Sequence, residues 1–318
     1  MPPRQISIRN GTWPGLETGA GDMRILLTGA TGLIGQTVRL VLAEKHDLIT
    51  FGRGPGSDIV ADFSQPDMIT AAALPMIDAL VHCAGVVDED FRDDPGRAIR
   101  MALFGADALA RGAVEAGAKR LVYLSSAHVY GPMIGCIDEN SAINPVSDYA
   151  IAHFAAEQAF RRQVTAGVAA LALRPCAVFG DLKSPSSFRR WSLIPFSFPL
   201  NAMNDHAIVI RSSGEQRRDF VGSEDIARTL RNWLDADAQG WSVINPVGRT
   251  SSSVHEFALL CARISEEITG IPCPIRREEA DGPTPGADFD FRSISGLTVS
   301  EQPLDAFVRR LCLQLAAA

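Results

Sequence analysis

The stretch from Thr28 to Gly35 constrains this chain most, because three evenly spaced glycines in it follow a short apolar run. Residues 25–27 form that run, and an amphipathic segment at 33–45 follows the glycines. The pattern predicts a buried strand, a tight glycine turn and a helix N-terminus. Amide groups and the positive dipole end at such a helix start favour an anion, so we predict a cradle for the pyrophosphate of a nicotinamide dinucleotide. The residues expected to contact it are Gly29, Thr31, Gly32, Leu33, Ile34 and Gly35.

Strand-like and helix-like patterns alternate through the first half of the chain. Predicted strands lie at 24–28, 47–51, 79–83, 120–125 and 168–173, and predicted helices at 33–45, 98–116 and 149–165. This alternation predicts an α/β fold, a Rossmann-type doubly wound parallel sheet with a smaller C-terminal substrate lobe. Ligands of such sheets bind at the carboxyl ends of the strands.

The alternation of strand-like and helix-like patterns ends after Gly180. Residues 181–210 read as a loop, because three prolines interrupt them. We therefore expect a disordered N-terminal extension at 1–22, a dinucleotide-binding domain at 23–180, and a mainly substrate-binding lobe at 181–318 with some segments returning to the first domain. The substrate site is expected between the two.

Composition limits the partners and the compartment. The chain has 318 residues and a net charge of -7, which argues against nucleic acid or an anionic membrane as a partner. No apolar stretch is long enough to span a bilayer, and the first 22 residues lack a signal-peptide core. None of the six cysteines forms a C-x-x-C pair, and the six histidines lack metal-ligand spacing. We expect a cytoplasmic enzyme without a metal.

The end of the second predicted strand bears on the choice of cofactor. An acidic residue near Gly52 would bind the ribose 2′-hydroxyl of NAD, but the position offers Arg53 instead. Arg53 favours NADP through its 2′-phosphate, or it is a solvated loop arginine. Asp62 either accepts from the adenine amino group or caps the next helix. Further expected cofactor contacts are Phe63, Cys83, Ala84, Gly85, Tyr149 and His153.

A tyrosine and a histidine stand four residues apart, at Tyr149 and His153, and so share one face of a predicted helix. The tyrosine could give or take the proton of a substrate hydroxyl, and Ser126 could hold the same oxygen. The alternative is a partly buried tyrosine and a surface histidine. These residues alone favour that alternative.

Five motifs in order resemble the extended short-chain dehydrogenase/reductases, the NAD-dependent epimerase/dehydratase family. They are T-G-x-x-G-x-x-G at 28–35, a close match to D-x-V-x-H-x-A-[AG] at 78–85, S-S-x-x-V-Y-G at 125–131, R-P-x-x-V-[YF]-G at 174–180 and R-D-[FY]-[VI]-x-x-x-D-[IV]-A at 218–227. The resemblance spans residues 24 to about 245.

The resemblance implies roles for particular residues. Tyr149 would be the general acid/base and Ser126 the group that polarises the substrate oxygen. Arg218 would reach the diphosphate of a nucleotide sugar, and His128 would also contact substrate. Independently of the resemblance, Arg277 is a candidate substrate contact as an anion anchor in an acidic protein, although it reads equally as solvated charge. A homodimer is implied as well.

The chain departs from the family pattern at several positions. His153 replaces the lysine of Y-x-x-x-K, and Ala102 and Ala177 replace asparagines. Ala127 and His128 stand where dehydratases carry acidic residues, which argues against water elimination. The prediction is an NAD(P)-dependent oxidoreductase or epimerase that transfers a hydride at a carbinol or ketone carbon of a sugar-like small molecule. The alternative is a cofactor-binding protein with weak or no catalysis, a redox sensor or scaffold.

Overall fold

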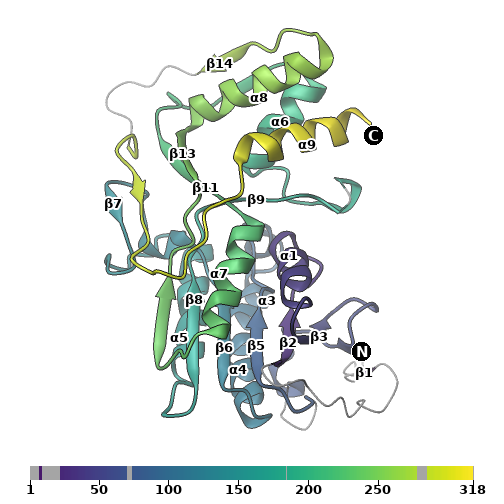
Figure 1. Cartoon of the computed structure of the whole chain (residues 1–318), viewed down its shortest axis with the longest axis vertical. Helices are drawn as coiled ribbons and strands as arrows, with labels where there is room; N and C mark the ends of the chain where they lie inside the picture. The colour runs from purple at the N-terminus through teal and green to yellow at the C-terminus, as the bar shows by residue number, and fades with distance from the viewer. Residues whose placement is uncertain (1–6, 9–21, 70–73, 184, 278–284, 318) are drawn as a thin grey trace. The chain divides into compact units, whose positions relative to one another are not determined.

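The computed structural model describes residues 7–8, 22–69, 74–183, 185–277 and 285–317 (Figure 1). Two compact units make up the chain: the first comprises Met1–Gly131, Ile143–Arg174 and Ala227–Ile244, and the second Pro132–Ala142, Pro175–Ile226 and Asn245–Ala318. Of the extension predicted at 1–22, only Ser7, Ile8 and Asp22 lie within the described residues.

A mostly parallel sheet forms the centre of the first unit (Figure 1). Its order is β1 (Ser7–Ile8), β4 (Ile59–Val60), β3 (Asp47–Gly52), β2 (Arg24–Thr28), β5 (Ala79–His82), β6 (Arg120–Leu124), β8 (Ala169–Leu173) and β12 (Trp241–Ile244). Every pairing is parallel except that of β1 with β4. The central strands are buried apolar runs, as expected when helices cover both faces. The predicted doubly wound α/β fold is confirmed.

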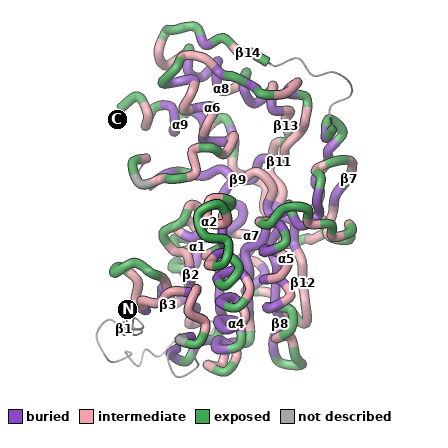
Figure 2. The backbone as a smooth tube through the Cα atoms, turned by 180° about the vertical axis from the view of Figure 1, so that it is seen from behind, coloured by how far each residue is buried: buried purple, intermediate pink, exposed green. Residues whose placement is uncertain are grey.

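Helices cover the two faces of this sheet. The first face carries α1 (Leu33–Leu42) and residues 227–235 of α7 (Ser223–Asp235), where Arg231 pairs with Glu44 at 2.8 Å and Lys45 with Asp235 at 2.6 Å. The opposite face carries α4 (Ala106–Glu115) and α5 (Asp148–Arg161), which pack on each other (Figures 1 and 2). Short elements complete the unit: η1 (Pro66–Met68), α2 (Asp88–Asp93) and η4 (Ala127–Tyr130). Figure 2 shows that the buried residues follow the strands of the sheet, whereas α2 contains no buried residue.

The single helix predicted at 98–116 is interrupted. The structure has α3 (Pro95–Ile99), a π-helical turn η3 (Arg100–Gly105) and then α4. A π turn contains one extra residue, which a search for 3.6-residue periodicity does not detect. Gly105 ends the turn, and an added Cβ there would lie 2.3 Å from the carbonyl oxygen of Phe63. The helix therefore contacts the Phe63 loop closely.

The second unit combines small sheets with three packed helices. Its sheets are β13 (Thr250–Ser253), β11 (Arg217–Gly222) and β9 (Ala177–Phe179); β10 (Ile208–Ile210) with β14 (Ile275–Arg277); and β15 (Asp290–Phe291) with β7 (Cys136–Ile137). Its helices α6 (Ile194–Asn204), α8 (Val254–Thr269) and α9 (Leu304–Ala316) pack on one another, and a short turn, η5 (Pro185–Ser187), precedes α6 (Figure 1). Among the described helices of the whole chain, none is both long and apolar enough to cross a membrane.

The prediction of a loop at 181–210 is wrong for the second half of this segment, where the structure has α6 and β10. Pro195 lies in the first turn of α6, where a missing N–H costs nothing. Pro199 lies inside the helix, yet Phe196 and Phe198 are buried among the neighbouring helices. Packing of this apolar helix therefore outweighs the local preference of proline.

A buried carboxyl holds a loop in the second unit. Asp219 on β11 is 3% exposed and accepts a hydrogen bond of 2.8 Å from the backbone N–H of Gly248. An added Cβ at Gly248 would lie 1.7 Å from the carbonyl oxygen of Phe220, so the loop lies directly on the strand. Burial raises the pKa of the Asp219 carboxyl to about 7, and Asp290 adds to the effect.

This shift gives the stability of the protein a pH dependence. The folded-state pKa of about 7 lies above the ordinary 3.8, so the folded chain binds the proton more tightly than the unfolded chain. Stability therefore falls as the pH rises between these values. Asp219→Asn keeps an acceptor for Gly248 and cannot ionise. We expect the wild type to lose about 3 kcal/mol more than this variant between pH 5 and pH 8, measured by urea unfolding.

The matched control is Asp305→Asn, since Asp305 is an exposed carboxylate in the first turn of α9. It is expected to keep the pH dependence of the wild type. Parallel pH profiles for wild type and Asp219→Asn would contradict the assignment.

Candidate functional site

Close backbone contacts build the glycine turn after β2. Gly29 has φ +69°, and an added Cβ there would lie 2.6 Å from the carbonyl carbon of Cys83. A Cβ on Gly35 would lie 2.0 Å from the carbonyl oxygen of Gly29. Gly32 is the N-cap of α1, no side chain caps that helix, and its first turn carries no acidic residue. The turn therefore leaves the helix start to an external anion, as a dinucleotide pyrophosphate requires.

The turn lies where the strand order reverses. From β2 the sheet continues to β3 and β4 on one side and to β5, β6 and β8 on the other. Ligands of doubly wound sheets bind at this switch point. The predicted contacts gather here: Thr31 lies in the turn before α1, Leu33 and Ile34 begin that helix, and the loop after β5 carries Cys83, Ala84 and Gly85.

Buried hydrogen bonds fix the loop after β5. The Thr28 hydroxyl lies 2.7 Å from Nδ1 of His82 and accepts from the backbone N–H of Ala84 at 3.3 Å. Burial lowers the pKa of His82 to about 3, so this imidazole is neutral at pH 7. Burial also raises the pKa of the Cys83 thiol to about 12, which makes it unreactive as a nucleophile.

Arg53 is exposed just after β3, and no described residue forms an ion pair or hydrogen bond with its guanidinium. The last residue of β3 is Gly52, so no carboxylate lies at the end of this strand. The position therefore offers positive charge to a ligand, although the alternative of a solvated loop arginine stays open.

The Asp62 carboxylate already has protein partners. It accepts from the backbone N–H of Ser64 at 2.9 Å and from Arg97 at 3.1 Å. Burial alone would raise the pKa of Asp62, but these bonds hold it below its ordinary value. The N-cap of the following η1 is Gln65, so the predicted helix cap at Asp62 is wrong, and the side chain closes a turn instead. The neighbouring Phe63 is buried.

Tyr149 lies in the first turn of α5, where Ser147 caps the helix by accepting from the backbone N–H of Ala150. Its ring is in edge contact with two imidazoles, and its ring centre lies 5.8 Å from that of His128 and 4.4 Å from that of His153. Ser126 caps the neighbouring turn η4 by accepting from the backbone N–H of His128. One unit thus brings the predicted catalytic tyrosine close to the turn that begins at the predicted serine.

His153 is 3% exposed, so the alternative of a surface histidine is wrong. Its Nδ1 lies 2.8 Å from the hydroxyl of Tyr123, at the end of β6. A Cβ added to Gly85 would lie 3.2 Å from its Cε1. His153 therefore lies between Tyr149 and the loop after β5, where the resemblance expects a lysine.

A row of rings joins these residues. Phe63 contacts His82, His82 contacts Tyr123, and Tyr123 contacts His153, with ring centres 5.5 to 5.8 Å apart. Tyr149 continues the row. The predicted cofactor contact Phe63 and the predicted catalytic residues Tyr149 and His153 therefore belong to one continuous row of packed rings.

A buried ion pair that sequence reasoning missed holds α5. Glu157 is fully buried and receives two hydrogen bonds from Arg174, of 2.9 and 2.7 Å. Ser125 donates a third, of 2.5 Å, to the same carboxylate. The Arg174 guanidinium also lies 4.8 Å from the ring centre of Tyr130. The sequence did hold one signal for Glu157. Tyr149, His153 and Glu157 follow one another at steps of four residues, which places them on one helix face.

The predicted substrate contacts Arg218 and Arg277 belong to the second unit. Arg218 lies on β11 and donates to the carbonyl oxygen of Arg217 at 2.7 Å. Arg277 is exposed on β14 and donates to the carbonyl oxygen of Ser213 at 3.3 Å. Both guanidinium groups retain further donors for an anion.

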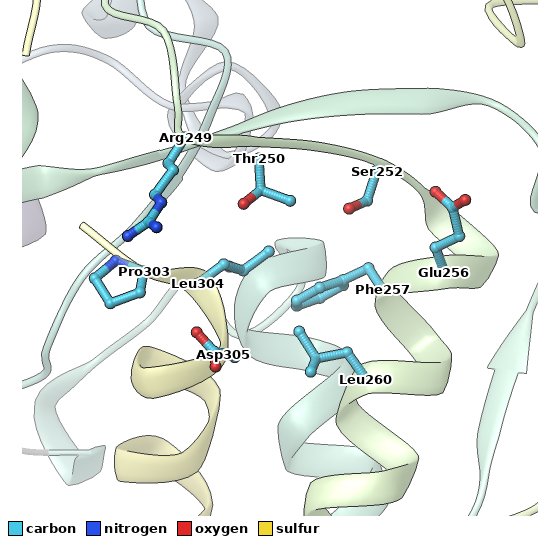
Figure 3. A pocket seen from close by; sticks show the side chains of 9 residues that line it. All are labelled: Arg249, Thr250, Ser252, Glu256, Phe257, Leu260, Pro303, Leu304 and Asp305. Atoms are coloured by element: carbon cyan, nitrogen blue, oxygen red, sulfur yellow. The ribbon is translucent and has the colours of Figure 1, made fainter. Parts of the chain in front are cut away.

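A shallow pocket of about 210 Å³ lies within the second unit. Figure 3 shows Phe257, Leu260 and Leu304 between α8 and α9, with polar side chains around them. The lining residues are Arg249, Thr250, Ser252, Glu256, Phe257, Leu260, Pro303, Leu304 and Asp305. They include none of the predicted site residues.

Comparison with known proteins places this geometry in a family. The sequence model of the NAD dependent epimerase/dehydratase family matches residues 25–245. Among curated proteins, none matches the sequence.

Several solved structures share the fold. MoeE5 in complex with UDP-glucuronic acid and NAD is 21% identical, with a TM-score of 0.73, and the match covers 92% of this chain and 99% of that one. UDP-glucose 4-epimerase of Thermotoga maritima with UDP-glucose is 18% identical, with a TM-score of 0.72 and coverages of 93% and 99%. RMD from Pseudomonas aeruginosa with NADPH is 21% identical, with a TM-score of 0.72 and coverages of 93% and 100%.

The buried ion pair predicts a large effect of one arginine. Arg174→Met leaves the Glu157 carboxylate buried without its cation, which is expected to cost about 3–5 kcal/mol of the free energy of unfolding in urea. The double variant Arg174→Met with Glu157→Leu removes both charges and should recover much of that loss.

The matched control is Arg162→Met, which removes an exposed ion pair with Asp107 at the end of the same helix. It should cost less than about 1 kcal/mol. Equal losses at the two arginines would show that the buried pair does not anchor α5.

Proposed function

Because this chain belongs to the NAD-dependent epimerase/dehydratase family, we propose that it transfers a hydride at a carbinol or ketone carbon of a nucleotide sugar or a similar substrate. The motifs at 28–35, 78–85 and 125–131 lie inside the matched segment 25–245. The observation that carries the proposal is the contact of Tyr149 with two imidazoles, in the unit that also holds the glycine turn.

The first unit supplies the residues that would hold the dinucleotide. The amides after Gly29 would bind the pyrophosphate, Phe63 would lie near the adenine, and the loop Ala84–Gly85 together with His153 would lie near the nicotinamide ribose. When bound, the nicotinamide ring supplies a hydride acceptor or donor.

Tyr149 is proposed to move the proton of the substrate hydroxyl. In its phenol form Tyr149 would donate a proton to a carbonyl oxygen, and in its phenolate form it would accept one from an alcohol, in step with chemistry at the adjoining carbon. The Ser126 hydroxyl would hold the same oxygen and orient it. No acidic side chain follows Ser126 in η4, so this arrangement favours hydride transfer over water elimination.

The nucleotide-sugar class rests on two observations. Several neighbours of the same fold were solved with UDP-sugars, among them MoeE5 and the Thermotoga maritima epimerase. The second unit of this chain offers Arg218 and Arg277, both with donors to spare, to a diphosphate.

Arg53 supports a choice between NADP(H) and NAD(H). An exposed arginine and a glycine at the end of β3 favour NADP(H), since a 2′-phosphate binds to a guanidinium by charge-assisted hydrogen bonds. NADPH would suit a reductase, whereas an epimerase returns the hydride to the same carbon. Turnover of a panel of nucleotide sugars with each cofactor separates these two reactions.

A second candidate is a dinucleotide-binding protein with little catalysis. It is favoured by His153, because the buried imidazole lacks the permanent charge that a lysine would place beside Tyr149. Dinucleotide binding without turnover on any ketone or sugar of the panel would support it.

A homodimer is also proposed. Ile99 and Phe104 around η3 and Ile151 on α5 are each about half exposed. These apolar side chains lie on packed neighbouring helices and would be covered by a second copy. Light scattering on the purified chain gives the mass directly.

Removing the phenol hydroxyl tests the catalytic assignment. Tyr149→Phe keeps the ring contacts with His128 and His153 but cannot move a proton. We expect kcat to fall about 100-fold or more while the dinucleotide Kd stays within about twofold. Unchanged turnover would exclude Tyr149 as the acid/base.

Removing the guanidinium tests the cofactor assignment. Arg53→Ala should weaken NADP(H) binding by about 10- to 100-fold, because a charge-assisted contact to phosphate is lost, and leave NAD(H) binding unchanged. The two dissociation constants are measured by calorimetry.

Arg111→Ala is the matched control, since Arg111 is an exposed arginine on α4 of the same unit. It should change neither constant. Equal weakening of NAD(H) and NADP(H) by Arg53→Ala would remove the 2′-phosphate argument.

A further inference from the structure

Tyr123 is a buried tyrosine outside every motif that the sequence offered. It lies on β6, is 2% exposed, and its hydroxyl is 2.8 Å from Nδ1 of His153. Its ring also contacts His82 and Phe160. The hydroxyl therefore reaches the one histidine that replaces the family lysine.

The direction of this hydrogen bond follows from the surroundings of the hydroxyl. Burial raises the pKa of Tyr123 well above its ordinary value, and Tyr149 and Glu157 add to the shift, so the group keeps its proton. A buried O–H needs an acceptor. Among the described residues that acceptor is Nδ1 of His153.

Glu157, the carboxylate whose charge acts on Tyr123, has other partners. Both oxygens of Glu157 receive hydrogen bonds from Arg174, and Ser125 adds one more. If Nδ1 of His153 carried the proton, the Tyr123 proton would be buried without a described acceptor. Tyr123 is therefore the donor, and Nδ1 is the acceptor.

An imidazole that accepts at Nδ1 carries its single proton on Nε2 when neutral. That edge of the ring lies toward the loop after β5. A Cβ added to Gly85 would lie 3.2 Å from Cε1 and 3.7 Å from Nε2. The N–H of His153 is thus presented on the side of Gly85, away from Tyr123.

We propose that Tyr123 is a positioning residue that fixes His153 as the Nε2-protonated tautomer and so presents an N–H donor to a hydroxyl oxygen of the dinucleotide beside Gly85. The proposal rests on the proposed function for the identity of that ligand. Tyr123 and His153 together would hold the dinucleotide hydroxyl by an oriented hydrogen bond, where a lysine would hold it by its charge.

A chemical restriction on His153 follows. Its acceptor nitrogen faces Tyr123, so the ring has no basic atom for the proton of Tyr149. His153 binds and orients, and the proton that Tyr149 takes up leaves by another route.

Nitrogen NMR on the whole protein tests the tautomer. With 15N-labelled histidine, the spectrum of the wild type should show His153 protonated at Nε2 and bare at Nδ1, with His153→Gln used to assign the signals. In Tyr123→Phe the Nδ1 signal should move toward that of a nitrogen without a donor. Tyr130→Phe removes the other buried tyrosine hydroxyl and should leave the His153 signals unchanged.

Dinucleotide binding tests the positioning role. Tyr123→Phe should weaken binding about fivefold to tenfold, the effect of one lost orienting hydrogen bond, and Tyr130→Phe should leave it within about twofold. The pH dependence of binding should also change in Tyr123→Phe alone, because only that variant frees a titratable nitrogen.

Two results would overturn the inference. The first is a wild-type His153 protonated at Nδ1, and the second is equal dinucleotide affinity and pH dependence in Tyr123→Phe and wild type. A wild type that binds neither dinucleotide overturns the proposed function instead, and the NMR spectrum still decides whether Tyr123 sets the tautomer.

Discussion

The buried ion pair between Glu157 and Arg174 sets the rotation of α5 about its axis. Arg174 follows β8 directly, so the pair ties the helix to the carboxyl end of the sheet. Tyr149 and His153 stand eight and four residues before Glu157, on the same helix face. Two charges without water must stay together, and this requirement holds the phenol and the imidazole in register with the strand ends.

Sequence patterns predicted the strands of the sheet well, but they did not predict the π turn or the proline-containing helix. Apolar runs such as Arg24–Thr28 matched their strands, because a strand buried on both faces has a strong local signature. The π turn at Arg100–Gly105 and the proline-containing α6 depend on contacts between distant segments, which a local pattern does not contain. The family itself was predicted from five motifs, and the match over residues 25–245 confirms it.

The site residues divide in the same way. Gly29 and Gly35 could be predicted because their close contacts require glycine whatever the rest of the chain does. The burial of His153 could not be predicted, because the pattern Y-x-x-x-H does not contain the strand residue that packs against the histidine. Tyr123 lies in the ordinary apolar run 120–124, and only the fold brings it under α5.

The position of β12 at the edge of the first sheet has a consequence for biosynthesis. Its partner β8 consists of small and aliphatic residues that are all buried, yet β12 emerges from the ribosome about seventy residues later, at Trp241–Ile244. Until then β8 is an unprotected apolar edge, the kind of strand that pairs with other chains. Nascent chains that stall between residues 174 and 241 therefore expose an apolar strand edge that favours aggregation.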